Sequence, residues 1–79
     1  MFINKSEEGK NNICGKKIAK YRKNLKISQR ELADRLQLLG LDIDKNAIQR
    51  MESGQRFITD IEVLYLINVF DITLNDLFM

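Results

Sequence analysis

Apolar residues recur along this chain at intervals of three and four positions, a spacing that places them on one face of an α-helix. The first such stretch follows Asn12, which can cap a helix, and extends to about residue 24. The second begins after Ser28 and ends at Gly40, and the third begins after Asp44 and ends at Gly54. These boundaries predict three short helices joined by tight turns.

Two four-residue motifs, SQRE at 28–31 and TDIE at 59–62, have the pattern of a capping box. In a capping box the first hydroxyl accepts a hydrogen bond from the backbone three residues later, and the glutamate side chain reaches back. The second motif predicts a fourth helix that ends near Phe70. Thr73 is expected to cap a last short helix.

Length and composition indicate one small globular domain. With 79 residues, 44% of them apolar, the chain can form a single core of modest size. Residues 1–12 are mostly polar and are expected to form a flexible N-terminal tail, which leaves residues 13–79 as the domain. There is no proline and no alternating apolar pattern, so the sequence predicts a compact all-α fold of five helices.

Glu52 lies on the side of the third predicted helix that faces the core, because it follows Ile48 by four positions and Met51 by one. A carboxylate in that position needs a partner, since an unpaired buried charge is costly. Arg22 follows Ile18 by four positions on the first helix and is the candidate partner. The alternative is that Glu52 extends to solvent.

The charges are distributed unevenly along the chain. Residues 1–59 contain all 13 Lys and Arg against seven acidic residues, whereas residues 60–79 contain four acidic residues and no basic one. This division suggests a molecule that presents one side to a polyanion. An ordinary solvated surface explains the charges alone equally well.

Several classes of function are excluded by missing residues. Without histidine, the usual Cys/His zinc sites and Ser-His-Asp or Cys-His catalysis are impossible, and no phosphate-binding glycine motif is present. We therefore expect no enzyme, metal or cofactor. The single Cys14 is most simply a packing residue, which fits a reducing cytoplasm. No apolar run reaches the roughly 20 residues of a membrane helix.

Three segments together resemble a known family: CGKKIAKYRKNLKISQRELADRL, then NAIQRMESG, then FDITLNDLF. They are similar to the helix-turn-helix domain of the Cro and lambda-repressor type, also called the XRE family, over about residues 13–78. The resemblance implies a lambda-repressor-like bundle in which the second and third helices form the motif. It also implies that the residues matching Arg22 and Glu52 form an ion pair, in agreement with the burial argument.

The resemblance implies contacts with double-stranded DNA, because the second helix of the motif enters the major groove. The side chains that can hydrogen-bond to base edges, or contact a thymine methyl, are those at the family's base-reading positions. These are Lys45, Asn46, Ala47, Gln49 and Arg50. The residues expected at phosphates are Ser28, Gln29, Arg56 and Lys16. Without the resemblance, a merely soluble helix face is the simpler explanation.

Two departures from the family pattern affect this transfer of contacts. The family joins the two helices of the motif by about four residues, and LGLDID makes the connection longer by roughly five positions. Lys26 occupies a position where the family tends to have glycine, and a left-handed backbone there would cost about 1 kcal/mol.

The fourth predicted helix is apolar on more than one face. Its inward stripe is expected to contain Val63, Leu66, Ile67 and Phe70. Further apolar side chains near the C-terminus could form a homodimer surface, unless the small domain buries them itself. They are Leu64, Tyr65, Val69, Leu77 and Phe78.

The sequence therefore favours a sequence-specific DNA-binding transcriptional regulator, a small prokaryotic or phage repressor that acts as a dimer in the cytoplasm, associated with the nucleoid. The alternative is a protein-interaction module of the same fold, such as an antitoxin or adaptor. In that case the acidic C-terminal end would bind a protein partner, and DNA would not be retained.

Overall fold

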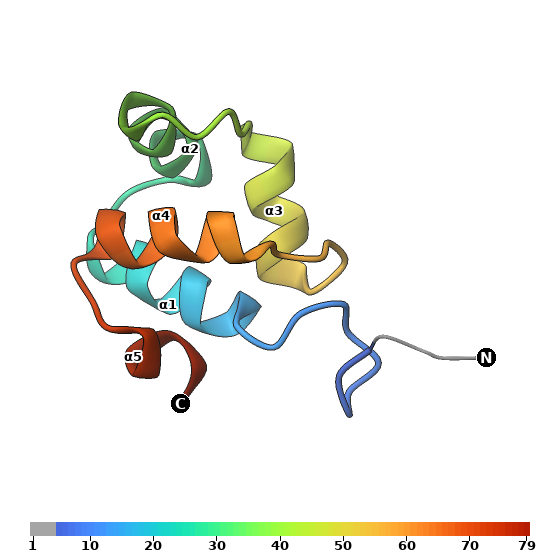
Figure 1. Ribbon diagram of the computed structural model, residues 1–79. Coiled ribbons are helices and arrows are strands. Elements are labelled where there is room, and N and C mark those ends of the chain that lie inside the picture. Colours follow the sequence, from blue (N-terminus) through green and yellow to red (C-terminus); the bar gives the residue numbers. More distant parts are fainter. Residues whose placement is uncertain (1–4) are drawn as a thin grey trace.

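The computed structural model describes residues 5–79, and the part of the expected tail at residues 1–4 lies outside them. Five helices and no strand are found in the described residues, which confirms the all-α fold (Figure 1). The helices are α1 (Gly15–Asn24), α2 (Gln29–Leu39), α3 (Lys45–Ser53), α4 (Asp60–Phe70) and α5 (Leu74–Phe78). None of them is long and apolar enough to cross a membrane.

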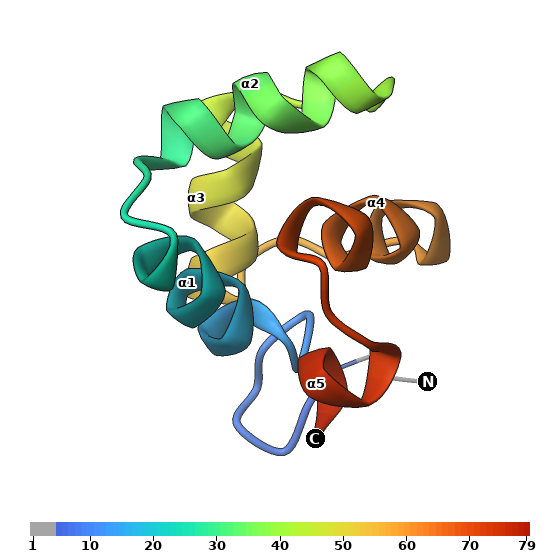
Figure 2. The same cartoon turned by 90° about the vertical axis from the view of Figure 1, so that its left-hand side faces the viewer.

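The helices are arranged around a shared interior. Figure 1 shows α2 and α3 on either side of the top of the molecule, with α4 crossing in front of α1 and α5 at the C-terminal end. The view in Figure 2 shows α2 above α1, with α3 connecting the two levels. α3 contacts both α1 and α2, and α4 also contacts both. The helix that carries the predicted DNA contacts is therefore fixed by two other helices.

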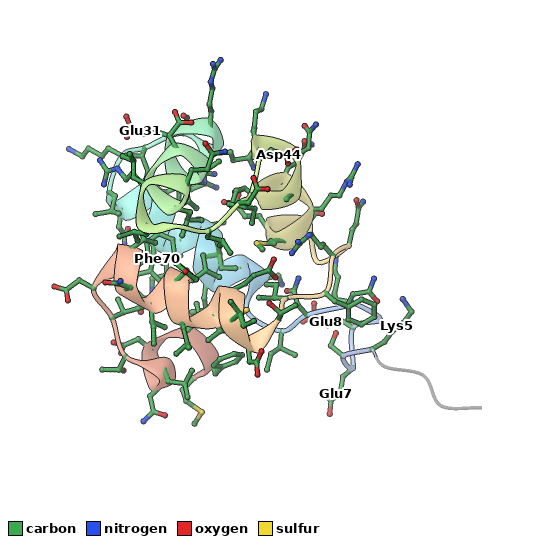
Figure 3. All side chains as sticks on the ribbon, turned by 45° about the horizontal axis from the view of Figure 1, so that its top comes forward. Lys5, Glu7, Glu8, Glu31, Asp44 and Phe70 are labelled. Atoms are coloured by element: carbon green, nitrogen blue, oxygen red, sulfur yellow. The ribbon has the colours of Figure 1, made fainter. Side chains whose placement is uncertain are left out.

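Predicted caps begin four of the helices. Ser28, Asp44, Thr59 and Thr73 each accept a hydrogen bond from the backbone three residues later. Figure 3 shows Asp44 at the start of α3. The box at Thr59 is complete, and Thr73 forms a second one, because Asp76 reaches back.

Two helix starts differ from the prediction. Only half of the box at Ser28 forms: the Glu31 carboxylate lies 3.5 Å from Arg35, a cation one turn along the same exposed face, in place of returning to the cap. α1 begins at Gly15, later than expected, although Oδ1 of Asn12 still accepts a bond from the Gly15 amide at 2.9 Å.

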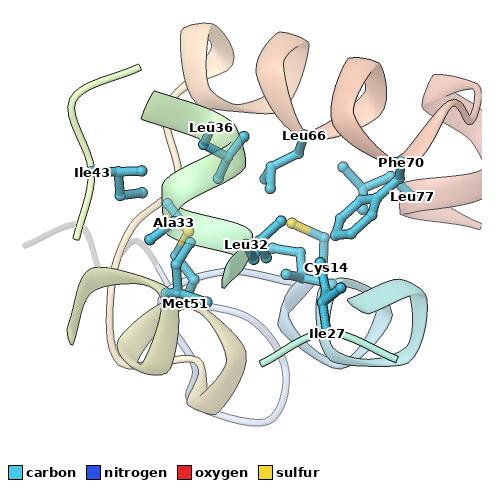
Figure 4. Close-up of a cluster of buried hydrophobic side chains, with 12 residues drawn as sticks. Cys14, Ile27, Leu32, Ala33, Leu36, Ile43, Met51, Leu66, Phe70 and Leu77 are labelled. Atoms are coloured by element: carbon cyan, nitrogen blue, oxygen red, sulfur yellow. The ribbon is translucent and has the colours of Figure 1, made fainter. Parts of the chain in front are cut away.

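The core consists of apolar side chains from all five helices and from two connections (Figure 4). Cys14 belongs to it, as expected of a packing residue, and burial raises the pKa of its thiol. Ala33 is 2% exposed between larger neighbours and is a small residue on the buried side of α2. The fully buried side chains include Ile18, Leu32, Leu36, Ile48, Met51, Leu66 and Leu77.

The connection between α2 and α3 is a well-anchored loop. α2 continues through Leu39, so the connection comprises only residues 40–44. It is about one residue longer than the family's four, and the expected lengthening by roughly five positions was wrong. Gly40 has a left-handed backbone with φ 110°. Ile43 inserts into the core, and its carbonyl accepts a 2.6 Å hydrogen bond from the side chain of Gln37. Lys26 is also left-handed, with φ 59°, so the position where the family tends to have glycine carries the strained backbone here.

The expected apolar surface near the C-terminus is smaller in the structure. Leu77 was expected on it, but its side chain is fully buried because α5 packs against α1. Tyr65 and Val69 are half-buried against the core, whereas Leu64 is 64% exposed. Phe78 is 38% exposed.

Candidate nucleic-acid interface

The N-terminal half of α3 exposes a row of polar side chains. Ile48 and Met51 are fully buried and fix the opposite side of the helix. This orientation leaves four side chains exposed beside the half-buried Ala47. Figure 3 shows side chains projecting outward from α3 near Asp44. The four are Lys45, Asn46, Gln49 and Arg50. Within residues 5–79 their side chains have no hydrogen bond or ion pair, so their donors and acceptors are available to a ligand.

The C-terminal half of α3 is held by an ion pair with α1. Nε of Arg22 lies 2.7 Å from Oε2 of Glu52, and Nη2 lies 3.1 Å from Oε1. The two side chains are only 12% and 9% exposed, so the predicted pair is confirmed as a buried one. Nη1 of Arg22 also donates to the carbonyl of Ile27 at 2.8 Å, which anchors the turn before α2.

Gln29 joins this ion pair, which was not anticipated. Its Nε2 donates to Oε1 of Glu52 at 3.0 Å, so one carboxylate connects α1, α2 and α3. An amide nitrogen has two hydrogens, and the second remains for a ligand at the start of α2. The helical pattern gave no indication of this contact, because Gln29 is the first residue of α2 and its reach depends on how α2 and α3 cross.

A second ion pair shapes the loop between α3 and α4. Nη1 of Arg56 donates to Oε1 of Glu62 at 2.9 Å and to the Phe57 carbonyl at 3.1 Å, and Nη2 donates to Oε2 of Glu62 at 2.8 Å. The Thr59 amide donates to the same carboxylate at 2.9 Å. Burial opposes ionisation of Glu62, but the bonds from Arg56 and Thr59 outweigh it and lower the pKa of this carboxyl. The hydrogen bond to Glu62 correspondingly raises the pKa of Arg56.

The remaining residues expected at phosphates lie at the starts of two helices. Ser28 uses its hydroxyl oxygen to cap α2, as predicted. Lys16, in the first turn of α1, has an exposed side chain whose ammonium lies 3.8 Å from Glu8. It lines an open pocket of about 560 Å³ together with Ser53 and Gly54 at the end of α3.

Comparison of the sequence with protein-family models identifies the family to which this arrangement of helices belongs. A family model described as helix-turn-helix matches residues 18–77. The chain belongs to this helix-turn-helix family. The match confirms the resemblance to the Cro and XRE type, and α2 and α3 are the two helices of the motif. No curated protein and no solved structure matches the chain.

Membership of the helix-turn-helix family assigns the chain to the DNA-binding transcription regulators, a class that is generally not enzymatic. The match begins at Ile18 and therefore leaves out residues 5–17. In this helix-turn-helix protein, the two ends of α3 differ in their contacts. Its first half exposes unpaired polar groups, and its last turn is bonded to α1 and α2 through Glu52.

Proposed function

We propose that this helix-turn-helix protein binds double-stranded DNA in a sequence-specific way, with the N-terminal half of α3 in the major groove. The observation that supports this most directly is the row of exposed side chains on α3 without partners in the described residues. Lys45 and Arg50 supply cationic donors for guanine O6 and N7. Asn46 and Gln49 supply the donor and acceptor pair that matches adenine, and Ala47 offers a methyl group to thymine.

Contacts with the DNA backbone fix the position of the domain. We assign one to the free amide hydrogen of Gln29 and to the backbone amides at the start of α2, where the helix dipole favours an anion. Lys16 adds an exposed charge at the start of α1. Ser28 and Arg56 complete the proposed set, although Arg56 already makes three hydrogen bonds within the chain. We expect its contribution to be the smallest.

A single domain of this size reads few base pairs, so we propose that it acts as a symmetric dimer on two half-sites. Of the apolar residues expected at the dimer surface, Leu64 and Phe78 remain exposed. They lie in the acidic segment 60–79, which carries four acidic residues and no basic one, so this end would face away from DNA. A dimer in the cytoplasm that covers its site would act as a repressor.

A selection from randomised duplexes with the purified protein tests this function. The proposal expects an enriched motif, repeated with two-fold symmetry, and an affinity that falls steeply as the salt concentration rises. If no motif were enriched, specific reading of DNA would be refuted. Co-purification of a protein partner by a preparation that retains no DNA would favour an interaction module, for which the exposed Leu64 is the supporting observation.

A further inference from the structure

The C-terminal end of α3 needs hydrogen-bond donors that α3 itself does not supply. The last carbonyl groups of any helix have no partner within the helix. Here the chain just beyond the helix supplies three donors for two carbonyls: the Gly54 amide donates to the Met51 carbonyl at 3.1 Å, and the amides of Gln55 and Arg56 donate to the Arg50 carbonyl at 2.9 and 3.2 Å. The carbonyls of the last turn and of the following loop still require donors.

Three consecutive residues of the N-terminal segment supply these donors. Nζ of Lys10 donates to the Ser53 carbonyl at 3.1 Å. The backbone amide of Asn11 donates to the Gly54 carbonyl at 2.8 Å, and its side-chain amide donates to the Gln55 carbonyl at 2.7 Å. These partners lie more than 40 residues away in the sequence, so the segment closes over the end of α3.

Asn12 occupies the centre of this contact. Its Nδ2 donates to the Met51 carbonyl at 3.1 Å and to the Arg56 carbonyl at 2.8 Å, while its Oδ1 accepts from the Gly15 amide. One side chain thus binds the start of α1, the last turn of α3 and the loop before α4. The helices touch beside it, because a Cβ atom added at Gly15 would overlap the backbone oxygen of Met51.

The segment that carries these residues is folded on itself. The Ser6 amide donates to the Lys10 carbonyl at 2.7 Å, and the Lys10 amide donates to the Ser6 hydroxyl at 3.1 Å. Nζ of Lys5 donates to Oδ1 of Asn11 at 2.8 Å, which orients the amide toward Gln55. Residues 5–12, expected to be part of a flexible tail, therefore form a turn bonded to the end of α3.

We propose that Lys10, Asn11 and Asn12 are positioning residues for the recognition helix, and that sequence discrimination depends on them. The inference rests on the proposed function of α3. A binding site requires side chains held to about 0.5 Å, and a site whose supporting residues are loose can be present in a folded protein and still work poorly. The family match covers residues 18–77, so these three residues lie before the matched stretch.

The test compares Asn11→Ala and Asn12→Ala in the full chain with Asn68→Ala. Asn68 is exposed on α4, and its side chain has no hydrogen bond within the described residues. The measured quantity is the ratio of affinities for the selected motif and for a scrambled duplex, counted per folded molecule by circular dichroism. We expect Asn12→Ala to lower this ratio about tenfold and Asn11→Ala to lower it roughly threefold. Asn68→Ala should leave it unchanged.

Unchanged ratios for both folded variants would overturn the inference. If Asn12→Ala did not fold, Asn11→Ala would decide, because it removes only the two hydrogen bonds of an accessible side chain, those with Lys5 and Gln55. If the unaltered protein preferred no sequence, the proposed function would fail on its own. Amide hydrogen exchange would then test the positioning: exchange in α3 should accelerate more than in α2 for Asn11→Ala, and equal exchange would refute it.

Discussion

The two halves of α3 differ in what their side chains and carbonyls contact. The N-terminal half exposes Lys45 and Asn46, whose side chains have no partner within residues 5–79. The C-terminal half is held at its last turn: Glu52 accepts from Arg22 and Gln29, and the carbonyls of Ser53 and Met51 accept from Lys10 and Asn12. One helix nine residues long thus contains an open half and a held half.

This difference bears on the proposed reading of DNA, because it shows how a small domain can hold a helix firmly and still leave its polar face exposed. Holding the last turn costs no polar group of the reading surface, because the holding contacts use Glu52 and backbone carbonyls. Asp44 fixes the other end with a single bond to the Ala47 amide at 2.8 Å and leaves the first turn accessible. Perturbing the held half should therefore change stability, and discrimination too where the contacts of residues 10–12 are removed, whereas perturbing the open half should change binding alone.

The largest loss of stability is expected from Arg22→Met, which leaves the buried Glu52 carboxylate with the neutral Gln29 amide as its one side-chain partner within residues 5–79. Removing one member of a buried ion pair should lower the free energy of unfolding by about 3 kcal/mol. Chemical denaturation measures this change in the free energy of unfolding. The matched control is Arg35→Met, which breaks a half-exposed pair with Glu31 and should cost at most about 0.5 kcal/mol. Equal losses of stability for the two variants would contradict the conclusion that the buried pair with Glu52 holds α3.

A smaller effect is expected from Gly15→Ala, at the contact between α1 and α3. The added Cβ would overlap the Met51 oxygen and lie 3.0 Å from the Glu52 oxygen, both of them backbone atoms that cannot rotate away. Separating the helices should cost about 2 kcal/mol. Gly9→Ala is the control, since nothing lies within 4 Å of its added Cβ and only its left-handed φ of 77° is strained. Thermal or urea unfolding measures both variants. If Gly9→Ala were less stable than Gly15→Ala, the explanation by close packing of α1 and α3 would be refuted.

Glu62→Gln should lower stability at neutral pH by about 1.5 kcal/mol, because it weakens the hydrogen bonds to Arg56. The folded protein holds the pKa of this carboxyl below its ordinary value of 4.5. The contribution of Glu62 is therefore complete above pH 4.5 and disappears as the pH falls through the lower folded value. Unfolding measured from pH 7 to pH 2 should show the two proteins converging in acid. A constant difference would contradict the role of ionised Glu62.

The smallest of these effects is expected from Gln29→Ala, which removes one hydrogen bond to Glu52 and the proposed phosphate contact. Stability should fall by about 1 kcal/mol. Affinity should fall similarly for motif and scrambled duplexes, because a phosphate contact carries no base information. Parallel titrations of the two duplexes measure this, and a loss confined to the motif would instead show that Gln29 acts on base reading.

Features determined by neighbouring residues could be predicted from the sequence. The caps at Ser28, Asp44 and Thr59 follow from local patterns, and all three are found. The pair between Arg22 and Glu52 was also predictable, since helical spacing carried both residues toward the interior and the family resemblance agreed.

Contacts that depend on tertiary geometry could not be predicted in this way. Asn12 was recognised only as a helix cap, because nothing in a polar segment shows which carbonyls it will meet 39 residues later. The bonds of Arg56 to Glu62 were not foreseen either, since the course of the loop decides the reach of this side chain. Leu77 belonged to an apolar pattern that serves a surface or a core equally well, and the packing of α5 buries it.

The central claim is that the open half of α3 reads bases, and a selection from randomised duplexes with Asn46→Ala tests it most directly. Asn46 is exposed and unpaired in the described chain, so its removal should leave the fold and the stability intact. The account predicts that the variant loses the preference at one position of the motif and keeps the others, while Asn68→Ala reproduces the complete motif. A folded Asn46→Ala protein that selected the unaltered motif at every position would contradict it.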